Sequence, residues 1–185
     1  IGDDFVRVVE RLEAVSGISA YELNFSCPNV KEGGLSFSAN AATAHQVAQA
    51  VRRVTARPLI VKLTPNVTSI SEIGLAVQEA GADAVSAINT LVGMSVDIHS
   101  RRPRLASVTG GLSGPAIKPV ALAKVYELVR SLRIPVIAIG GIFTAEDALE
   151  FLIVGARAVQ IGTASFVHPD AALQVIQGLE TYCAE

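Results

Sequence analysis

The feature that most constrains this chain is a series of short, almost wholly apolar segments separated by stretches with helical patterns. Strands that are buried on both faces, as in a parallel sheet, have this composition, rich in valine, isoleucine and alanine. Five such segments occur, namely AYELNFS (20–26), PLIVKLT (58–64), DAVSAINT (83–90), IPVIAIGG (134–141) and RAVQIGTA (157–164). We therefore predict five parallel strands alternating with helices.

Apolar residues spaced three and four apart predict a helix before the first strand and helices between the later ones. The predicted buried faces are Phe5, Val8, Val9, Leu12 and Val15; Val47, Val51 and Val54; Ile70, Ile73 and Val77; Leu122, Val125, Val129 and Leu132; and Ala145, Ala148, Leu149 and Leu152. Two helix starts have the spacing of a capping box, Ser69 with Glu72 and Thr144 with Asp147.

Two of these units resemble each other in sequence. EAGADAVSAINT and IVGARAVQIGTA each place a glycine eight residues before a polar residue, Gly81 before Asn89 and Gly155 before Thr163. The glycine would end a helix, and the polar residue would lie at the carboxyl end of the next strand. This arrangement suits a (β/α) barrel, in which the loops after the strands carry the chemistry. The plainer alternative is that any α/β protein reuses Gly-Ala turns.

A complete barrel has eight strands and usually about 200 residues or more, whereas this chain has 185 residues. Because the chain opens on a helix, we expect the missing strands to belong before it. The fold class predicted is a (β/α)8 TIM barrel, of which the chain supplies about the last five β/α units. Residues 1–185 would then be the carboxyl-terminal portion of a single domain. A complete five-stranded doubly wound sheet is the alternative.

The last two strands end in a pattern typical of a phosphate site. Gly140 and Gly141 precede a helix that Thr144 would cap, and Gly162 and Thr163 follow the next strand. Glycines let a phosphate approach backbone N–H groups, and barrels place such a site after their last two strands. The segment GGLSGPAIKP (110–119) is predicted to be another loop that exposes its backbone. The alternative is that Gly140 and Gly141 are ordinary turn glycines.

Polar residues also gather where the earlier strands end, namely Asn24, Cys27, Asn29, Lys62, Asn89 and Thr90. Lys62 is unusual because it interrupts an apolar strand, and burying an ammonium group without a partner is costly. Its side chain would either extend to solvent or face an anionic ligand. Cys27, between a serine and a proline, is either a reactive thiol or a buried structural cysteine.

Composition excludes several classes of function. The formal net charge of −2 and a pI near 5.9 give no reason to expect nucleic acid or an anionic membrane as partner. Cys27 and Cys183 have neither metal-ligand nor disulfide-framework spacing, which fits a reducing cytoplasm and no metal. No apolar run approaches the roughly 18 residues that a membrane-spanning helix needs. The basic segment SRRPR (100–104) is predicted to be a solvated loop.

Seven motifs carry a family resemblance, in order along the chain: ELNFSCPNVKEGG, VKLTPNV, AINTLVGMSVD, RRPRL, GGLSGPAIKPVAL, GGIFTAEDALEFL and VQIGTASF. The chain resembles the class 1 dihydroorotate dehydrogenases, and the catalytic subunit of the NAD-linked type B in particular. The resemblance implies a (β/α)8 barrel that holds FMN and oxidises (S)-dihydroorotate to orotate in pyrimidine (UMP) biosynthesis. It also implies that about the first hundred residues, with three strands of the barrel, are missing.

The resemblance assigns roles to individual residues. Cys27 would be the catalytic base that removes the C5 proton, while hydride passes to FMN. Substrate would be bound by Asn24, Asn29, Asn89 and Thr90. FMN would be held by Asn24, Lys62, Ile88, Gly114, Gly140, Gly141, Gly162 and Thr163. Because a thiol has an ordinary pKa of about 8.5, activity should rise with pH.

The resemblance also implies partners. A homodimer would bind a separate electron-transfer subunit carrying FAD and a 2Fe–2S cluster, which passes electrons to NAD. Type A relatives use fumarate instead, but KLTPN and GGLSGPAIKPVAL favour type B here. Two other interpretations stay open. One is the flavin domain of a dihydropyrimidine dehydrogenase, which usually has histidine where this chain has Asn29, and the other is an inactive truncated barrel.

Overall fold

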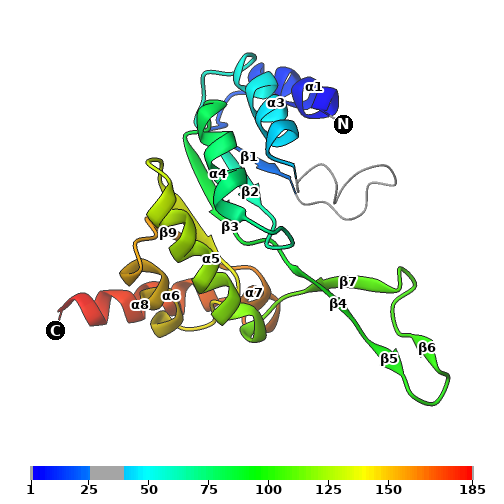
Figure 1. Ribbon diagram of the computed structural model, residues 1–185. Coiled ribbons are helices and arrows are strands. Elements are labelled where there is room, and N and C mark those ends of the chain that lie inside the picture. The colour runs from blue at the N-terminus through cyan, green and yellow to red at the C-terminus, as the bar shows by residue number, and fades with distance from the viewer. Residues whose placement is uncertain (1, 26–39, 185) are drawn as a thin grey trace.

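The computed structural model describes residues 2–25 and 40–184 (Figure 1). The helices in this part of the chain are α1 (Gly2–Glu13), α3 (Ala41–Arg52), α4 (Ile70–Glu79), α5 (Lys118–Ser131), α6 (Ala145–Ile153), α7 (Thr163–Val167) and α8 (Ala171–Ala184), with a short 3-10 helix, η1 (Pro115–Ile117). The strands are β1 (Tyr21–Asn24), β2 (Leu59–Leu63), β3 (Ala84–Ala87), β4 (Leu91–Met94), β5 (Val96–Asp97), β6 (Arg102–Pro103), β7 (Thr109–Leu112), β8 (Val136–Ile139) and β9 (Ala158–Gln160).

The main sheet contains all five predicted strands, in the order β1-β2-β3-β8-β9, and each neighbouring pair is parallel. A doubly wound sheet reverses its strand order at a switch point, whereas this order follows the sequence throughout the described residues. Right-handed crossovers in one direction place the connecting helices on one face of a sheet. The prediction of part of a (β/α) barrel is therefore confirmed, and the doubly wound alternative is wrong.

Side chains alternate between the two faces of this sheet. The face toward the helices is apolar and fully buried at Leu59, Val61 and Val85, which pack with α3, α4 and α5 in one core. The opposite, inner face carries polar side chains, including Glu22 and Lys62. Polar groups are thereby kept out of the helix-facing core and collected on the concave side.

The predicted face of α1 is partly wrong. Val9 is buried and Phe5 and Leu12 pack against the core, but Val8 is 56% exposed and Val15 is 47% exposed. Successive residues of a helix point about 100° apart, so Val8 cannot share the stripe that Val9 occupies. Val15 lies beyond the end of α1. Val6 takes the partly buried place instead.

The two similar units have the same helix ending. Gly81 and Gly155 have positive φ angles of 97° and 110°. Each glycine N–H bonds a carbonyl of the preceding turn, and the following alanine N–H bonds Val77 O or Phe151 O. This is the double hydrogen bond of a Schellman motif. The repeated Gly-Ala sequence thus forms the same turn twice, and each turn sets the direction in which the chain enters the following strand.

Both predicted helix starts are capped. The Ser69 hydroxyl accepts a hydrogen bond from the Glu72 N–H, and Thr144 and Asp147 form a reciprocal capping box. The second cap lies directly after the Gly140–Gly141 pair, so it fixes how the chain leaves β8.

A protruding arm, residues 91–112, was not predicted. In it β4 pairs with β7 and β5 pairs with β6, both antiparallel, and the arm extends away from the sheet and helices (Figure 1). The prediction that residues 110–119 form a loop is therefore wrong except at Ser113 and Gly114, because Gly110–Leu112 belong to β7, Pro115–Ile117 to η1, and Lys118 begins α5. The strands of the arm are short, are interrupted by glycine and proline, and are largely exposed, so they lack a buried apolar pattern.

Candidate active site

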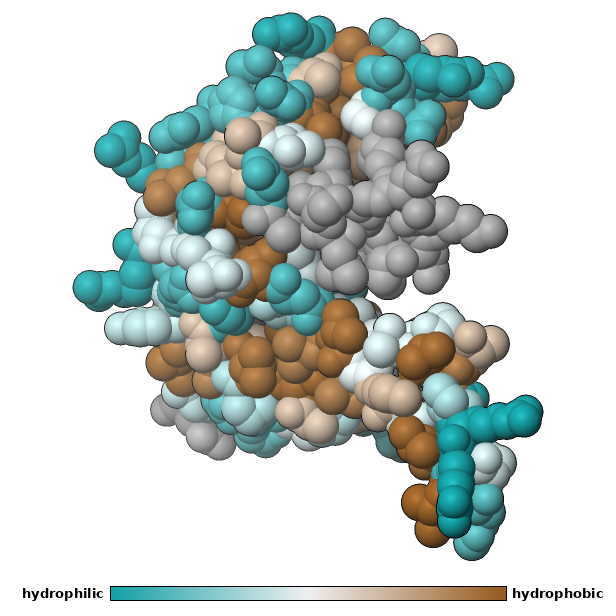
Figure 2. Space-filling view, turned by 45° about the vertical axis from the view of Figure 1, so that its right-hand side comes forward, coloured by the Kyte–Doolittle hydropathy of each residue, from teal (hydrophilic) through white to brown (hydrophobic). Residues whose placement is uncertain are grey.

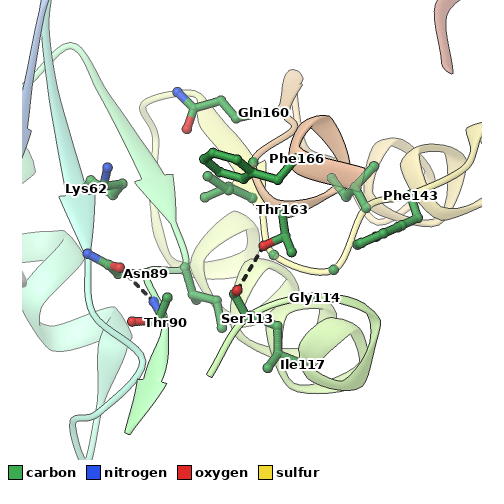
Figure 3. Close-up of a pocket in the computed structure, with 16 residues that line it drawn as sticks. Lys62, Asn89, Thr90, Ser113, Gly114, Ile117, Phe143, Gln160, Thr163 and Phe166 are labelled. Carbon is green, nitrogen blue, oxygen red and sulfur yellow. Dashed lines mark hydrogen bonds between the residues drawn. The ribbon is translucent and has the colours of Figure 1, made fainter. Parts of the chain in front are cut away.

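A pocket of about 220 Å³ opens at the carboxyl ends of the parallel strands (Figure 3). Its walls come from the ends of β2, β8 and β9, from the loops after β3, β8 and β9, from α7, and from the segment that joins the arm to α5. The residues that line it are Lys62, Ile88, Asn89, Thr90, Ser113, Gly114, Ile117, Ile139, Gly140, Gly141, Ile142, Phe143, Gln160, Gly162, Thr163 and Phe166. The carboxyl edge of the sheet is where barrel sites form.

Most of the residues singled out in the sequence meet here. The pocket is lined by Lys62, Ile88, Asn89, Thr90, Gly114, Gly140, Gly141, Gly162 and Thr163. Asn24 is the last residue of β1 and touches the pocket wall through Asn89. Cys27 and Asn29, the candidate base and one candidate substrate ligand, lie outside the described residues.

Lys62 is placed near the end of β2 and has a definite partner. Its Nζ lies 3.2 Å from Glu22 Oε1 on the neighbouring strand β1, and its side chain is 21% exposed. Among the described residues that line the pocket, Lys62 alone carries a full charge. An ammonium group held in this wall can attract an anionic ligand.

Two hydrogen bonds orient the side-chain amide of Asn89, which follows β3. Asn89 Nδ2 donates to Asn24 Oδ1 at 3.0 Å, and the Thr90 N–H donates to Asn89 Oδ1 at 2.7 Å. Figure 3 shows the second of these bonds. The Asn89 side chain is therefore fixed between the ends of two strands.

Asn66 holds the base of the arm. Its Nδ2 donates to Thr90 O at 3.0 Å and to Thr64 Oγ1 at 3.1 Å, and its Oδ1 accepts from the Val92 N–H at 3.1 Å. The loop after β2 is thus tied to both the pocket residue Thr90 and the first strand of the arm.

The segment that follows the other end of the arm is tied to the first residue of α7. Thr163 Oγ1 donates to Ser113 Oγ at 2.8 Å across the pocket wall (Figure 3). The residues that flank the two ends of the arm, Thr90 and Ser113, consequently both line the pocket.

The glycines of the site divide into two kinds. A Cβ on Gly140 would lie 2.9 Å from Ala121 Cβ, and one on Gly141 would lie 2.7 Å from Lys118 Cβ, so these two permit close packing as well as positive φ. A Cβ on Gly162 would meet no described heavy atom within 4 Å, and one on Gly114 only Thr163 Cγ2 at 3.8 Å. The space beside the Cα atoms of Gly114 and Gly162 is therefore uncrowded, although Gly114 is buried and Gly162 is exposed.

An ionic network holds the loop between β8 and α6. Lys118 Nζ lies 2.7 Å from Asp147 Oδ1 and 2.8 Å from Glu150 Oε1, and hydrogen bonds to these two carboxylates raise the pKa of Lys118. Burial disfavours the charge of Asp147, but hydrogen bonds from Lys118 and from the Phe143 and Thr144 N–H groups lower its pKa overall. Asp147 thereby anchors the loop next to the pocket.

The donor set suits a flat ring with an anionic tail. The isoleucines and the rings of Phe143 and Phe166 offer apolar contact, while Lys62, Gln160 and the backbone of the lining glycines offer positive potential and hydrogen bonds. Such convergence of a few polar groups on an apolar hollow is typical of cofactor sites.

Sequence reasoning missed the apolar lining residues Ile117, Ile139, Ile142, Phe143 and Phe166 and the polar residues Glu22, Asn66, Ser113 and Gln160. Two of them could have been found. Gln160 is a polar residue at the end of an apolar strand, and Lys62 has a similar position near the end of another. Ser113 lies in the glycine-rich segment GGLSG, directly before Gly114. Glu22 carried no such signal, because it reads as the outward polar residue of an alternating strand.

Comparison with known proteins gives the family. The family described as dihydroorotate dehydrogenase matches residues 2–182. The chain belongs to the dihydroorotate dehydrogenase family. The predicted resemblance to this family is confirmed.

Relatives named as the catalytic subunit of dihydroorotate dehydrogenase B (NAD(+)) are similar over nearly the whole chain. The protein from Trichlorobacter lovleyi is 54% identical over 183 residues, which are 99% of this chain and 60% of the relative. The one from Alkaliphilus oremlandii is 53% identical, over 97% of this chain and 59% of the relative. The chain thus spans about 60% of the length of these dihydroorotate dehydrogenases.

A solved structure of a family member has the same arrangement of elements. The dihydroorotate dehydrogenase of Eimeria tenella, in complex with ferulenol, superposes with a TM-score of 0.79 at 25% identity. The match covers 96% of this chain and 53% of that one. The sheet and helices described above are therefore part of the family's barrel.

Two further structural findings concern residues 2–25 and 40–184. No helix there is long and apolar enough to cross a bilayer. No group of three or more histidine, cysteine, aspartate or glutamate side chains there could hold a metal ion.

Proposed function

We propose that this chain carries the flavin and substrate site of a dihydroorotate dehydrogenase that oxidises (S)-dihydroorotate to orotate in pyrimidine biosynthesis. The observation that carries the proposal is the convergence of Lys62, Asn89, Thr90 and the glycine loops on one pocket of a chain that belongs to this family. Family membership alone would leave the site unassigned, since function resides in particular residues rather than in a fold.

FMN fits the residues present. The uncrowded glycines Gly114 and Gly162 would lie next to its phosphate, with Gly140, Gly141 and Thr163 beside it. Ile88 would contact its ring system, and Lys62 would face its polar edge, with Asn24 nearby. FMN when bound supplies the acceptor for the hydride that leaves C6 of dihydroorotate.

The protein's own side chains would bind the substrate and move its proton. Cys27 is the proposed base for the C5 proton, and a thiolate is the form able to accept it. Asn24, Asn29, Asn89 and Thr90 are the proposed substrate ligands, since neutral amides and a hydroxyl match the donors and acceptors of a pyrimidine ring. The bonds that fix Asn89 support this role, because a preset amide need not be ordered on binding.

Electrons would leave through a partner. We propose a separate subunit with FAD and a 2Fe–2S cluster and NAD as final acceptor, because the relatives from Trichlorobacter lovleyi and Alkaliphilus oremlandii are named as NAD(+)-linked catalytic subunits. The fumarate-linked alternative would need no such subunit. We also propose a homodimer. The cytoplasmic location stays a prediction.

An anaerobic absorbance experiment tests the proposal. The purified protein should show the visible bands of oxidised flavin, and adding dihydroorotate should bleach them. Bleaching by dihydrouracil in preference to dihydroorotate would instead favour the dihydropyrimidine dehydrogenase alternative. A colourless protein that stays colourless with added FMN would contradict the proposal and favour the inactive barrel.

A further inference from the structure

A carboxylate on the inner face of the sheet joins side chains from four strands. Glu22 on β1 accepts hydrogen bonds from Ser86 Oγ on β3 at 3.1 Å and from Gln160 Nε2 on β9 at 2.7 Å. Its other oxygen lies 3.2 Å from Lys62 Nζ on β2. Glu22 is not one of the described residues that line the pocket, but its partners Lys62 and Gln160 are.

The bond between Glu22 and Gln160 crosses the concave side of the sheet. β1 and β9 are the two edge strands of the five. In a flat sheet they would lie roughly 19 Å apart, at about 4.8 Å per strand. Their side chains meet because the sheet curves as a barrel does. Glu22 therefore reaches across the interior, beneath the pocket.

We propose that Glu22 is a positioning residue for the flavin site, which it serves by holding Lys62 and Gln160 in the wall and by balancing the charge of Lys62. The inference rests on the proposed function. A carboxylate 3.2 Å from an ammonium group offsets much of its potential. Since the two side chains are only 21% and 26% exposed, water and salt screen the pair less than a surface pair.

Neutralising Glu22 should make the flavin easier to reduce. Lys62 would keep its positive charge without its partner, and a positive charge stabilises the more negative, reduced form of a bound flavin. A tenfold shift toward the reduced form corresponds to about 30 mV for a two-electron couple.

The test is the two-electron midpoint potential of FMN bound to the chain, measured for wild type and for Glu22→Gln. Glutamine can still accept the bonds from Ser86 and Gln160, so the fold should persist, which thermal unfolding checks. We expect Glu22→Gln to favour the reduced flavin at least tenfold. Lys62→Met should shift the potential the opposite way, and adding Glu22→Gln to Lys62→Met should then give a smaller rise, because only the direct effect of the carboxylate charge on the flavin is left to remove.

Glu13 offers a matched control. It accepts a hydrogen bond from the Thr55 hydroxyl at 2.6 Å and lies 3.4 Å from Arg57, so it too combines a hydroxyl donor with an ion pair. None of these three residues lines the pocket. Glu13→Gln should leave the flavin potential unchanged.

The possible outcomes separate the two proposals. An unchanged potential in Glu22→Gln, or the same rise in the Lys62→Met background, overturns the role of Glu22 through Lys62. If Glu22→Gln does not fold, Glu22→Asp replaces it, because the shorter carboxylate should give a smaller rise; no rise there also overturns the inference. A wild-type chain that binds no FMN overturns the proposed function itself, and the flavin role of Glu22 with it.

Discussion

Gly141 and Gly17 adopt the same left-handed backbone in different surroundings. Their φ angles are +79° and +86°. A Cβ on Gly141 would lie within 2.8 Å of Lys118 backbone atoms, whereas one on Gly17 would meet nothing within 4 Å. The pair separates the cost of the backbone conformation from the cost of crowding.

Gly17→Ala should therefore destabilise the protein by about 1–2 kcal/mol, the cost of a left-handed alanine. Gly141→Ala should cost about 1–3 kcal/mol more, because it overpacks against α5. Urea denaturation of both variants measures the difference. Equal losses in the two variants would mean that the loop moves away from Lys118 without cost.

Cys27→Ser should slow the reduction of bound flavin by dihydroorotate by about 10²–10⁴-fold, the usual contribution of a positioned base. Serine is a far weaker base than a thiolate at neutral pH, but it should leave flavin binding intact. Stopped-flow absorbance gives the rate, and the flavin content of the variant is the control. A normal rate at neutral pH would assign the base elsewhere.

Single residues could be found from the sequence when their type broke a local pattern. Lys62 interrupts an apolar strand, which marks it as a candidate site residue, but the sequence does not indicate that Glu22 is its partner. Glu22 lies in YELN, where a charged residue fits the alternation of a half-exposed strand. The Glu22 side chain faces the interior only because the sheet is curved. The local structure around Cys27 and Asn29 lies outside the described residues.

At the scale of elements, the junction of α5 and α6 depends on charge. Asp147 has a pKa below its ordinary value of 3.8, so its contribution is present above that value and is lost as pH falls through the lower, folded-state pKa. The contribution of Lys118 depends on pH in the opposite direction. Because its pKa is raised in the folded protein, this contribution is lost only as the pH rises through the raised pKa.

Asp147→Asn should thus lower stability at neutral pH by about 1.5–3 kcal/mol, the range for hydrogen bonds to a charged group. The deficit should shrink as the pH falls below 3.8, where wild type loses the same interactions. Denaturant titrations of both proteins across that range measure it. A deficit that stays constant with pH would contradict the ionic role.

The base of the arm offers a second test on an element. Asn66→Ala removes the acceptor of the Val92 N–H, so this amide should exchange with solvent markedly faster, as measured by NMR. The Ser100 N–H, which bonds Asp97 Oδ1 near the tip, is the internal control and should not change. Unaltered exchange at Val92 would show that the β4–β7 pairing holds the base without Asn66.

Elements were predictable where burial shaped their sequence. The strands of the main sheet are covered by helices, so each one reads as apolar, and the helix caps use side chains with specific spacing. The arm has no such cover. In LVGM and TGGL apolar and polar residues alternate only weakly, and both contain glycine. The two strands pair because the chain folds back on itself between them, which the local sequence of each strand does not encode.

At the scale of the whole molecule, the arm carries apolar side chains into solvent. Val92, Met94, Val96, Ile98 and Leu112 are all exposed, Ile98 at 78%. In Figure 2 hydrophobic and hydrophilic side chains lie next to each other on the arm. Exposed apolar surface of this kind often marks a contact between proteins, which supports the proposed homodimer.

Ile98→Lys should therefore weaken the dimer at least tenfold, because it would bury a charge in an apolar contact. Analytical ultracentrifugation gives the dissociation constant. Ile153→Lys is the matched control, since Ile153 is 73% exposed at the end of α6 and should have no effect. A monomeric wild type, or equal weakening by both variants, would contradict a dimer formed through the arm.

The arm has a further consequence, for evolution. Leu91 and Leu112 are partners across the β4–β7 ladder, so the two ends of the arm lie within about 6 Å of each other. A gene could lengthen, shorten or exchange everything between them while the chain still left and re-entered the barrel at the same two points. Natural selection could therefore revise the proposed dimer contact while the residues that line the pocket stay where they are.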